Sequence, residues 1–278
     1  MVGACTALVF ALHPAQTDAV AYISGGSQVL AATFVLSSLL TFAKFLDAQQ
    51  PQRLAWWLAS ALAMLLALGA RETAAVLPLA LGLRAATESG DPKRVPWLAL
   101  AASLLLVAAA LWLGWRLTAY SYLLDTSLAT RAPLDHLGVA TRGVFWLAGQ
   151  LVRWDRLTAD PALDTTNPWS FADFARAVAL CVCIAVAIGQ WRARRWLSFG
   201  VLWFLLWLAP THTLLARLDL ASDRHLYLPL VGLGFTAAVG VARLRRHAPI
   251  ATALLAGLFA YSVASRNLVW RDGIGDAP

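Results

Sequence analysis

Residues 97–115, WLALAASLLLVAAALWLGW, contain no charged side chain over their whole length. The hydrocarbon core of a membrane is about 30 Å thick, and about 20 helical residues cross it. A run of this length and composition is therefore typical of a membrane-spanning helix. The rest of the chain has the same character, because 60% of its 278 residues are hydrophobic and 13% are charged. Soluble domains have about 45–50% and about 25%, so we expect an integral membrane protein.

Other segments meet the same criterion of length and low charge, while two are shorter. The run 74–85 contains Pro78 and is expected to cross only obliquely or as a broken helix. Residues 1–12 form half a span; they lack the basic region and the cleavage site of a signal peptide. The sequence thus predicts an all-α, polytopic integral membrane helix bundle of about 8–9 spans, one of them truncated and one short. The remaining full-length spans are predicted at 27–46, 54–70, 174–191, 197–215, 226–242 and 248–264.

The formal net charge is +7, from 22 basic and 15 acidic residues. Short cytoplasmic loops collect Lys and Arg. If the four basic clusters face the cytoplasm, that side holds 11 basic and 3 acidic residues, which accounts for the whole excess. Topology therefore explains the basic balance, and we expect no nucleic-acid partner. The clusters are Lys44 with Arg53, Arg84 with Lys93 and Arg94, Arg192 with Arg194 and Arg195, and Arg243 with Arg245 and Arg246.

This topology requires residues 116–171 to stay on the non-cytoplasmic side. Within them, residues 137–154 are moderately apolar but carry Arg142, Gln150 and Arg153. Such a composition favours a helix that lies in the membrane interface. The alternative is a true span with a buried Arg, which would place the Arg192 cluster outside.

The polar stretch HPAQTDAVAYISGG, residues 13–26, lies on the non-cytoplasmic side in this topology. Pro14 ends the incoming helix, and Thr17 with Asp18 suits the cap of the next turn. Two interpretations of Asp18 stay open. It either caps that turn, or it faces a cavity at the membrane surface as a general base or metal ligand, with His13 nearby.

Arg71 and Glu72 lie between two apolar runs on the same side of the membrane. As a solvated ion pair or interface anchor they would contribute little to stability. Alternatively, the forked donors of the Arg71 guanidinium match two oxygens of a phosphate group. A lipid-linked phosphate in the outer leaflet is a natural ligand for such a group.

The stretch SDRHLYLP, residues 222–229, places four polar or amphipathic side chains where a span begins. Anchoring at the interface requires fewer such groups. Asp223 also suits the first turn of a helix through the helix dipole, so a capping role is the alternative. The other three side chains are Arg224, His225 and Tyr227.

Three motifs in this order resemble a known family: HPAQTDAVAYISG, RETAAVLPLALGL and ASDRHLYLPLVGLGF. They resemble the membrane part of the transmembrane and tetratricopeptide-repeat protein O-mannosyltransferases and their bacterial relatives, multi-span glycosyltransferases of the C-type fold. The ending RNLVWRDGIGDAP resembles the connector that leads into the repeats. The resemblance implies a partial transmembrane glycosyltransferase-like domain over residues 1–265 and a connector over residues 266–278.

The resemblance also implies the chemistry. Members of this family take a sugar, here of the mannose type, from a polyprenyl-phosphate donor on the non-cytoplasmic side. An acceptor hydroxyl of a protein or glycan displaces the lipid phosphate at the anomeric carbon while a carboxylate takes the proton. A divalent metal is the one cofactor that the resemblance leaves open, and no metal ligand is assigned. By their positions in the motifs, His13 and Asp18 are predicted as catalytic, Arg71, Glu72, Arg224, His225 and Tyr227 as binding the donor phosphate, and Asp223 as supporting.

The motifs depart from the family pattern at several positions. Asp18 stands where Glu is commoner, Gln16 where a second His is common, and Gly26 where Arg is common. Arg71-Glu72 replaces the usual Lys-Glu, and Asp223-Arg224-His225-Leu226-Tyr227 replaces the usual Glu-Arg-Tyr-Leu-Tyr.

The acidic pair that the family carries in its first outer loop lies upstream of these motifs. We therefore expect this chain to be incomplete and inactive alone, within a bacterial inner membrane and with its C-terminus on the non-cytoplasmic side. Two other functions stay open at this stage. One is a non-catalytic polytopic protein that binds polyprenyl phosphate; the other is a transporter, suggested only by Pro78 and by Pro210-Thr211-His212 within apolar runs.

Overall fold

The computed structural model is built from helices, as the sequence predicts. Every regular element in the described part of the chain is an α-helix or a 3-10 helix. The all-α prediction is therefore confirmed for those residues. The structure describes residues 1–21, 25–90, 94–116, 129, 132–153, 161, 163–164, 169–212 and 220–272.

Five helices are long and apolar enough to cross a membrane. Three shorter apolar helices accompany them. These helices support a polytopic membrane protein, while the number of about 8–9 spans stays a prediction. The five are α3 (Gly26–Asp47), α4 (Gln52–Ala70), α6 (Trp97–Arg116), α9 (Phe171–Gly189) and a segment, Arg245–Ser265, that falls mainly in α12 (Ala248–Asp272); the shorter ones are α1 (Val2–Leu12), α10 (Arg195–Leu208) and α11 (Pro229–Ala242).

Proline decides two helix boundaries. The span predicted at 197–215 is shorter in the structure, because α10 ends at Leu208. Pro210 has no N–H to continue the helical ladder, and the amides of Thr211 and His212 bond back to the Leu208 carbonyl in a turn, at 3.2 and 3.1 Å. The predicted broken helix around Pro78 is present as the 3-10 helix η2 (Glu72–Val76) followed by α5 (Leu77–Ser89), with the proline in the first turn of α5.

The segments outside the predicted spans include one further long helix and several short elements. The helix predicted at 137–154 is α8 (Pro133–Gln150), which is not among the five helices that qualify as spans. The loop 116–171 is otherwise described only in part, and most of its residues lie outside the described ranges. In the predicted connector 266–278, α12 continues to Asp272, and residues 273–278 lie outside the described ranges. The remaining elements are α2 (Gln16–Ala21), η5 (Asp223–Leu226) and η6 (Arg245–His247).

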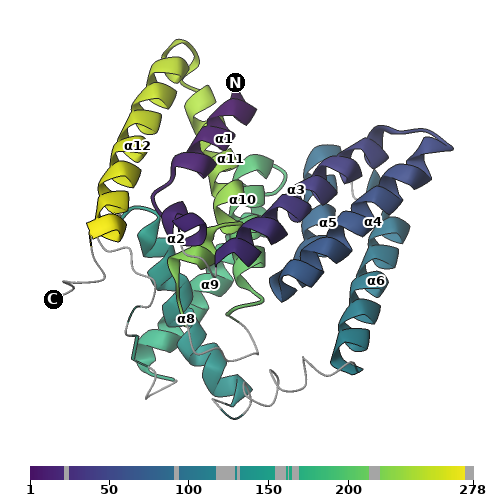
Figure 1. The fold of residues 1–278 in the computed structure, drawn as a ribbon, viewed down its shortest axis with the longest axis horizontal. Coiled ribbons are helices and arrows are strands. Elements are labelled where there is room, and N and C mark those ends of the chain that lie inside the picture. The colour runs from purple at the N-terminus through teal and green to yellow at the C-terminus, as the bar shows by residue number, and fades with distance from the viewer. Residues whose placement is uncertain are drawn as a thin grey trace.

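The helices form two groups that meet along α5 and α10. Helices α3 to α6 pack on one side of the molecule, and α1, α10, α11 and α12 pack on the other, with α8 and α9 below them (Figure 1). A core of fully buried side chains joins the two groups, because Trp203 of α10 packs with Phe42, Met64, Leu77 and Leu81 of the first group. Outward-facing side chains are apolar as well: Leu98 is 86% exposed and Leu105 is 70% exposed. An apolar exterior of this kind suits a lipid environment.

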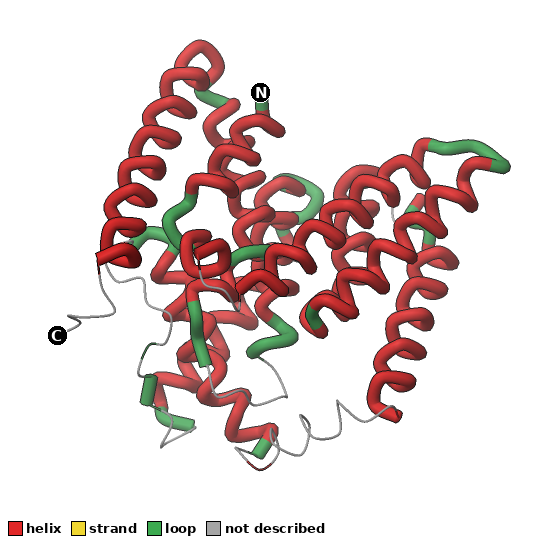
Figure 2. The backbone as a smooth tube through the Cα atoms, viewed as in Figure 1, coloured by secondary structure: helices red, strands yellow, loops and turns green. Residues whose placement is uncertain are grey.

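The basic turns gather at one end of the bundle. The turns between α3 and α4 and between α11 and α12 lie at the same end as the N-terminus, whereas α8 and the last turns of α12 lie at the opposite end (Figure 2). The α9–α10 turn joins the basic end as well, because the guanidinium of Arg195 lies directly over Gly90 at the end of α5. This arrangement agrees with the predicted clustering of Lys and Arg on one side.

Candidate functional site

Asp18 joins two segments that are far apart in the sequence. It lies in the first turn of α2 and is 1% exposed. Its Oδ2 accepts hydrogen bonds from the Ser222 hydroxyl and from the Arg224 amide, both at 3.1 Å. The carboxylate therefore caps η5 rather than the turn beside it in the sequence.

The second carboxylate oxygen of Asp18 is buried and has no hydrogen-bond partner among the described residues. Buried polar atoms rarely stay without a partner in folded proteins. This oxygen is therefore available to accept a hydrogen bond or a proton from a bound group.

A small polar pocket lies beside η5. It is lined by Arg71, Gln28, Trp207 and His225, among others, and its volume of about 10 Å³ leaves room for about one water molecule. Within the described part of the chain, the Gln28 side-chain oxygen and the Trp207 indole N–H have no hydrogen-bond partner. The pocket thus presents a cation, an acceptor and a donor on the ends of three helical segments.

Buried histidines lie next to this pocket. The rings of His212 and His225 are 5.7 Å apart between centroids, and the Thr211 hydroxyl lies 2.7 Å from His212 Nδ1. Burial, and then the nearby His225, lowers the pKa of His212 to about 3, so its imidazole is neutral at ordinary pH. In the described ranges, no group of three or more His, Cys, Asp or Glu side chains is placed to hold a metal ion.

His13 faces a different part of the fold from Asp18. Its Nδ1 accepts from the Ala15 amide at 3.2 Å, which leaves the hydrogen on Nε2, 3.4 Å from the Leu151 carbonyl. Its ring also meets the edge of Phe259 in α12. Burial lowers the pKa of His13 to about 4. His13 therefore links the α1–α2 junction to the end of α8 as a neutral imidazole.

The other predicted site residues frame the same region. Asp223 is fully buried at the start of η5. Tyr227 directly follows η5 and packs edge-on against Phe10, and burial raises the pKa of its phenol. Glu72 begins η2 and is half-buried beside Arg71. Of the eight predicted residues, the structure thus brings Asp18 and the η5 residues together directly and adds Arg71 through the pocket.

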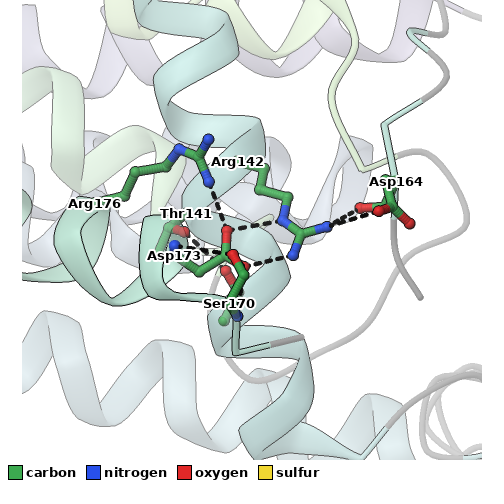
Figure 3. Close-up of polar contacts among 7 residues, drawn as sticks. Thr141, Arg142, Asp164, Ser170, Asp173 and Arg176 are labelled. Carbon is green, nitrogen blue, oxygen red and sulfur yellow. Dashed lines mark hydrogen bonds and ion pairs between the residues drawn. The ribbon is translucent and has the colours of Figure 1, made fainter. Parts of the chain in front are cut away.

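A second polar cluster, centred on Asp173, was missed in the sequence analysis (Figure 3). Asp173 is fully buried in the first turn of α9. Its two oxygens accept from Nε and Nη2 of Arg142 in α8, and Oδ1 also accepts from Arg176 at 2.6 Å. The Ser170 hydroxyl donates to Oδ2 at 2.6 Å. One carboxylate therefore fastens α8 to the start of α9.

Two signals pointed to this cluster. Ser170 and Asp173 have the spacing of a capping box, and the structure contains both of its hydrogen bonds. Arg142 stood out as a charge on a moderately apolar helix, and its forked donors are suited to a carboxylate. That the two would meet across the loop was not visible in the sequence.

Comparison with known proteins adds no relative. No family model, no curated protein and no solved structure matches the chain. The fold is an all-helical bundle in its described residues, with apolar helices that suggest a membrane protein and a buried polar region where α2 packs on η5, next to the pocket lined by Arg71 and His225.

Proposed function

We propose that this chain is part of a membrane glycosyltransferase that uses a polyprenyl-phosphate-linked sugar of the mannose type. The acceptor is a hydroxyl of a protein or glycan on the non-cytoplasmic side of a bacterial inner membrane. One observation supports the proposal above the others: the three motifs that resemble the O-mannosyltransferase family lie together in space. Asp18 of the first motif bonds to η5 in the third, and Arg71 of the second lines a pocket with His225 of the third.

The charges suit a phosphate leaving group. Arg71 and Arg224 are both partly exposed; Arg224 belongs to η5, and Arg71 lines the pocket beside it. Guanidinium groups bind phosphate oxygens through two parallel hydrogen bonds and stabilise the charge that develops on the leaving group. The pocket itself accepts only a water-sized group, so the donor phosphate is expected at its mouth, against these two side chains.

The reaction is a displacement at the anomeric carbon. The acceptor oxygen forms a bond to that carbon, the bond from the carbon to the phosphate oxygen breaks, and polyprenyl phosphate leaves with the electron pair. The proton of the acceptor hydroxyl goes to a carboxylate acting as general base. Asp18 is suited to a position next to the reacting hydroxyl, because its Oδ2 is held by η5 while its Oδ1 is available to accept a hydrogen bond.

Binding and turnover are tested separately. The chain is placed in lipid nanodiscs and titrated with a photoreactive polyprenyl phosphate, and the crosslinked fraction is measured. Arg71→Gln and Arg224→Gln are each expected to weaken binding about tenfold or more, because each removes a charged hydrogen bond. Arg246→Gln, an exposed cation in the turn at the opposite end of the bundle, is the matched control and should bind as the parent does.

Turnover of radiolabelled polyprenyl-phosphate mannose by the full-length protein then separates a transferase from a binding protein. Loss of transfer in Arg224→Glu, with transfer retained in Arg246→Glu, supports the proposal. Unchanged crosslinking in both Arg71→Gln and Arg224→Gln contradicts the phosphate site. Binding without transfer to any hydroxyl acceptor identifies a non-catalytic polyprenyl-phosphate-binding protein instead.

A further inference from the structure

A groove lies on the seam between the two helix groups, away from the site described above. Its volume is about 430 Å³, and residues of α1, α3, α5, α10 and α11 line it. On α10 it is lined by Phe199 and Trp203, whereas the small polar pocket meets Trp207 and Thr211 near the other end of that helix. The two cavities share no lining residue, although Trp203 of the groove and Trp207 of the pocket lie one helical turn apart on α10.

The lining of the groove has a polarity gradient. Most of it is apolar, from leucines of α3, aromatic side chains of α10 and α11, and Val231. Its polar members are Thr6 and the side chains of Arg84, Thr87 and Glu88, which lie in the last turns of α5, at the basic end of the bundle. The groove is therefore apolar towards the middle of the bundle and charged at one end.

A second cation stands at that end. Arg195, Phe199 and Trp203 are spaced four residues apart on α10 and so share one face of the helix. The guanidinium of Arg195 lies so close to Gly90 that a Cβ there would be only 1.9 Å from its Nη1. Arg195 is exposed, and among the described residues it forms no ion pair with an acidic side chain.

Arg84 is already held in place. It pairs with Glu88 at 2.9 Å and donates to the Leu39 carbonyl at 2.5 Å, so it closes the end of the groove rather than offering an unused charge. Arg195 is therefore the cation at the charged end of the groove whose N–H donors are available to a ligand.

We propose that this groove binds an anionic phospholipid from the leaflet at the basic end, with one acyl chain along the apolar lining and its phosphate against Arg195. The polarity gradient of the groove supports this ligand, because an apolar acyl chain matches the apolar part of the lining and an anionic headgroup matches the charged end. Basic side chains at the ends of membrane helices attract anionic headgroups, and an Arg fork matches a phosphodiester. Such a lipid packs between the two helix groups and stabilises their contact at α5 and α10.

Native mass spectrometry of the purified chain, with dioleoyl phosphatidylglycerol or dioleoyl phosphatidylcholine added back after delipidation, tests the proposal. One phosphatidylglycerol is expected to bind at least about tenfold more tightly than phosphatidylcholine, because both lipids carry a phosphodiester but phosphatidylcholine adds a choline cation, which the positive field at the basic end repels. Arg195→Gln should remove most of that preference, Arg195→Lys should retain part of it, and Arg246→Gln, a cation of another basic turn, should leave it unchanged.

A filled groove gives an independent variant. Leu36→Trp places a larger side chain in the lining and should weaken binding of both lipids while the helix content stays that of the parent. Equal affinity of parent and Leu36→Trp overturns the proposal, as does a preference that Arg195→Gln leaves intact. Binding of inorganic phosphate alone in place of the lipid would identify an anion site without a lipid tail. A dimer that forms on delipidation would identify a second copy of the chain as the occupant of the groove. Either outcome contradicts the proposal.

Discussion

The buried carboxylate of Asp173 neutralises the charge of Arg142, whose side chain is only 12% exposed. Asp173→Asn removes that negative charge and leaves the largely buried Arg142 with only the distant, exposed carboxylate of Asp164. Breaking one side of a buried pair costs about 3–5 kcal/mol. We therefore expect a clear fall in the thermal unfolding temperature of Asp173→Asn in detergent.

The same guanidinium provides the control. Asp164 lies 3.9 Å from Arg142 through an exposed carboxylate. Exposed ion pairs contribute about 0–1 kcal/mol, so Asp164→Asn should melt within a degree or two of the parent. Equal losses for the two variants would show that burial of Asp173 does not determine the strength of its pairing.

A second prediction at the residue scale concerns acid stability. The folded protein keeps His13 neutral, with its pKa lowered from 6.5 to about 4 by burial. Above pH 6.5 His13 does not lower the free energy of unfolding, because its imidazole is neutral in both the folded and the unfolded chain. As the pH falls below 6.5 the unfolded chain takes up a proton and the folded chain does not, so stability falls until about pH 4, with a loss of about 1 kcal/mol at pH 5.5.

Melting curves from pH 7.5 to 4 measure this loss. His13→Gln keeps a side-chain N–H for the Leu151 carbonyl but cannot titrate, so its curves should depend less on pH than those of the parent. The exposed His247→Gln should follow the parent. A pH dependence that is identical in parent and His13→Gln would rule out His13 as a source of acid instability.

At the scale of elements, α10 and α11 pack through a glycine. A Cβ on Gly232 would lie 2.6 Å from the Trp203 ring, whose indole N–H donates to the Leu228 carbonyl at 2.9 Å. Gly232→Ala must push that ring away, and overpacking of this kind costs about 1–3 kcal/mol. Gly240 lies on the same helix with nothing within 4 Å of its Cβ position. Gly240→Ala should therefore be neutral or stabilising in a thermal melt, and the prediction fails if the two substitutions behave alike.

The helices themselves could be predicted largely from composition. The runs 27–46, 54–70 and 97–115 correspond to α3, α4 and α6 because uninterrupted apolar sequence has few alternatives to a helix in lipid. The end of α10 was predicted seven residues too late, because hydropathy continues past Pro210 while hydrogen bonding does not.

At the scale of the whole molecule, the contacts that assemble the polar region could not be predicted. Asp18 and Ser222 are 204 residues apart, and each had a local capping role available in the sequence. Only the packing of α2 against η5 selects the long-range bond. The same holds for Arg142 and Asp173, whose meeting depends on how α8 returns to α9. Residue types therefore identified the polar groups, but tertiary packing decided their partners.

The final prediction concerns the topology of the whole chain, since all the basic turns should face one side of the membrane. In a background without Cys5, Cys181 and Cys183, single cysteines are placed at exposed positions and labelled with a membrane-impermeant maleimide from either side of sealed vesicles. Cysteines in three basic turns should react from one side, and a cysteine in the last turns of α12 from the other. If the α9–α10 and α11–α12 positions reacted from the side opposite to the α3–α4 position, and the α12 position from the same side as it, α8 would cross the membrane and its interfacial placement would be wrong, because one added crossing reverses every later turn relative to the first. The positions are Gln49, Ala193 and His247 for the basic turns and Asn267 for α12.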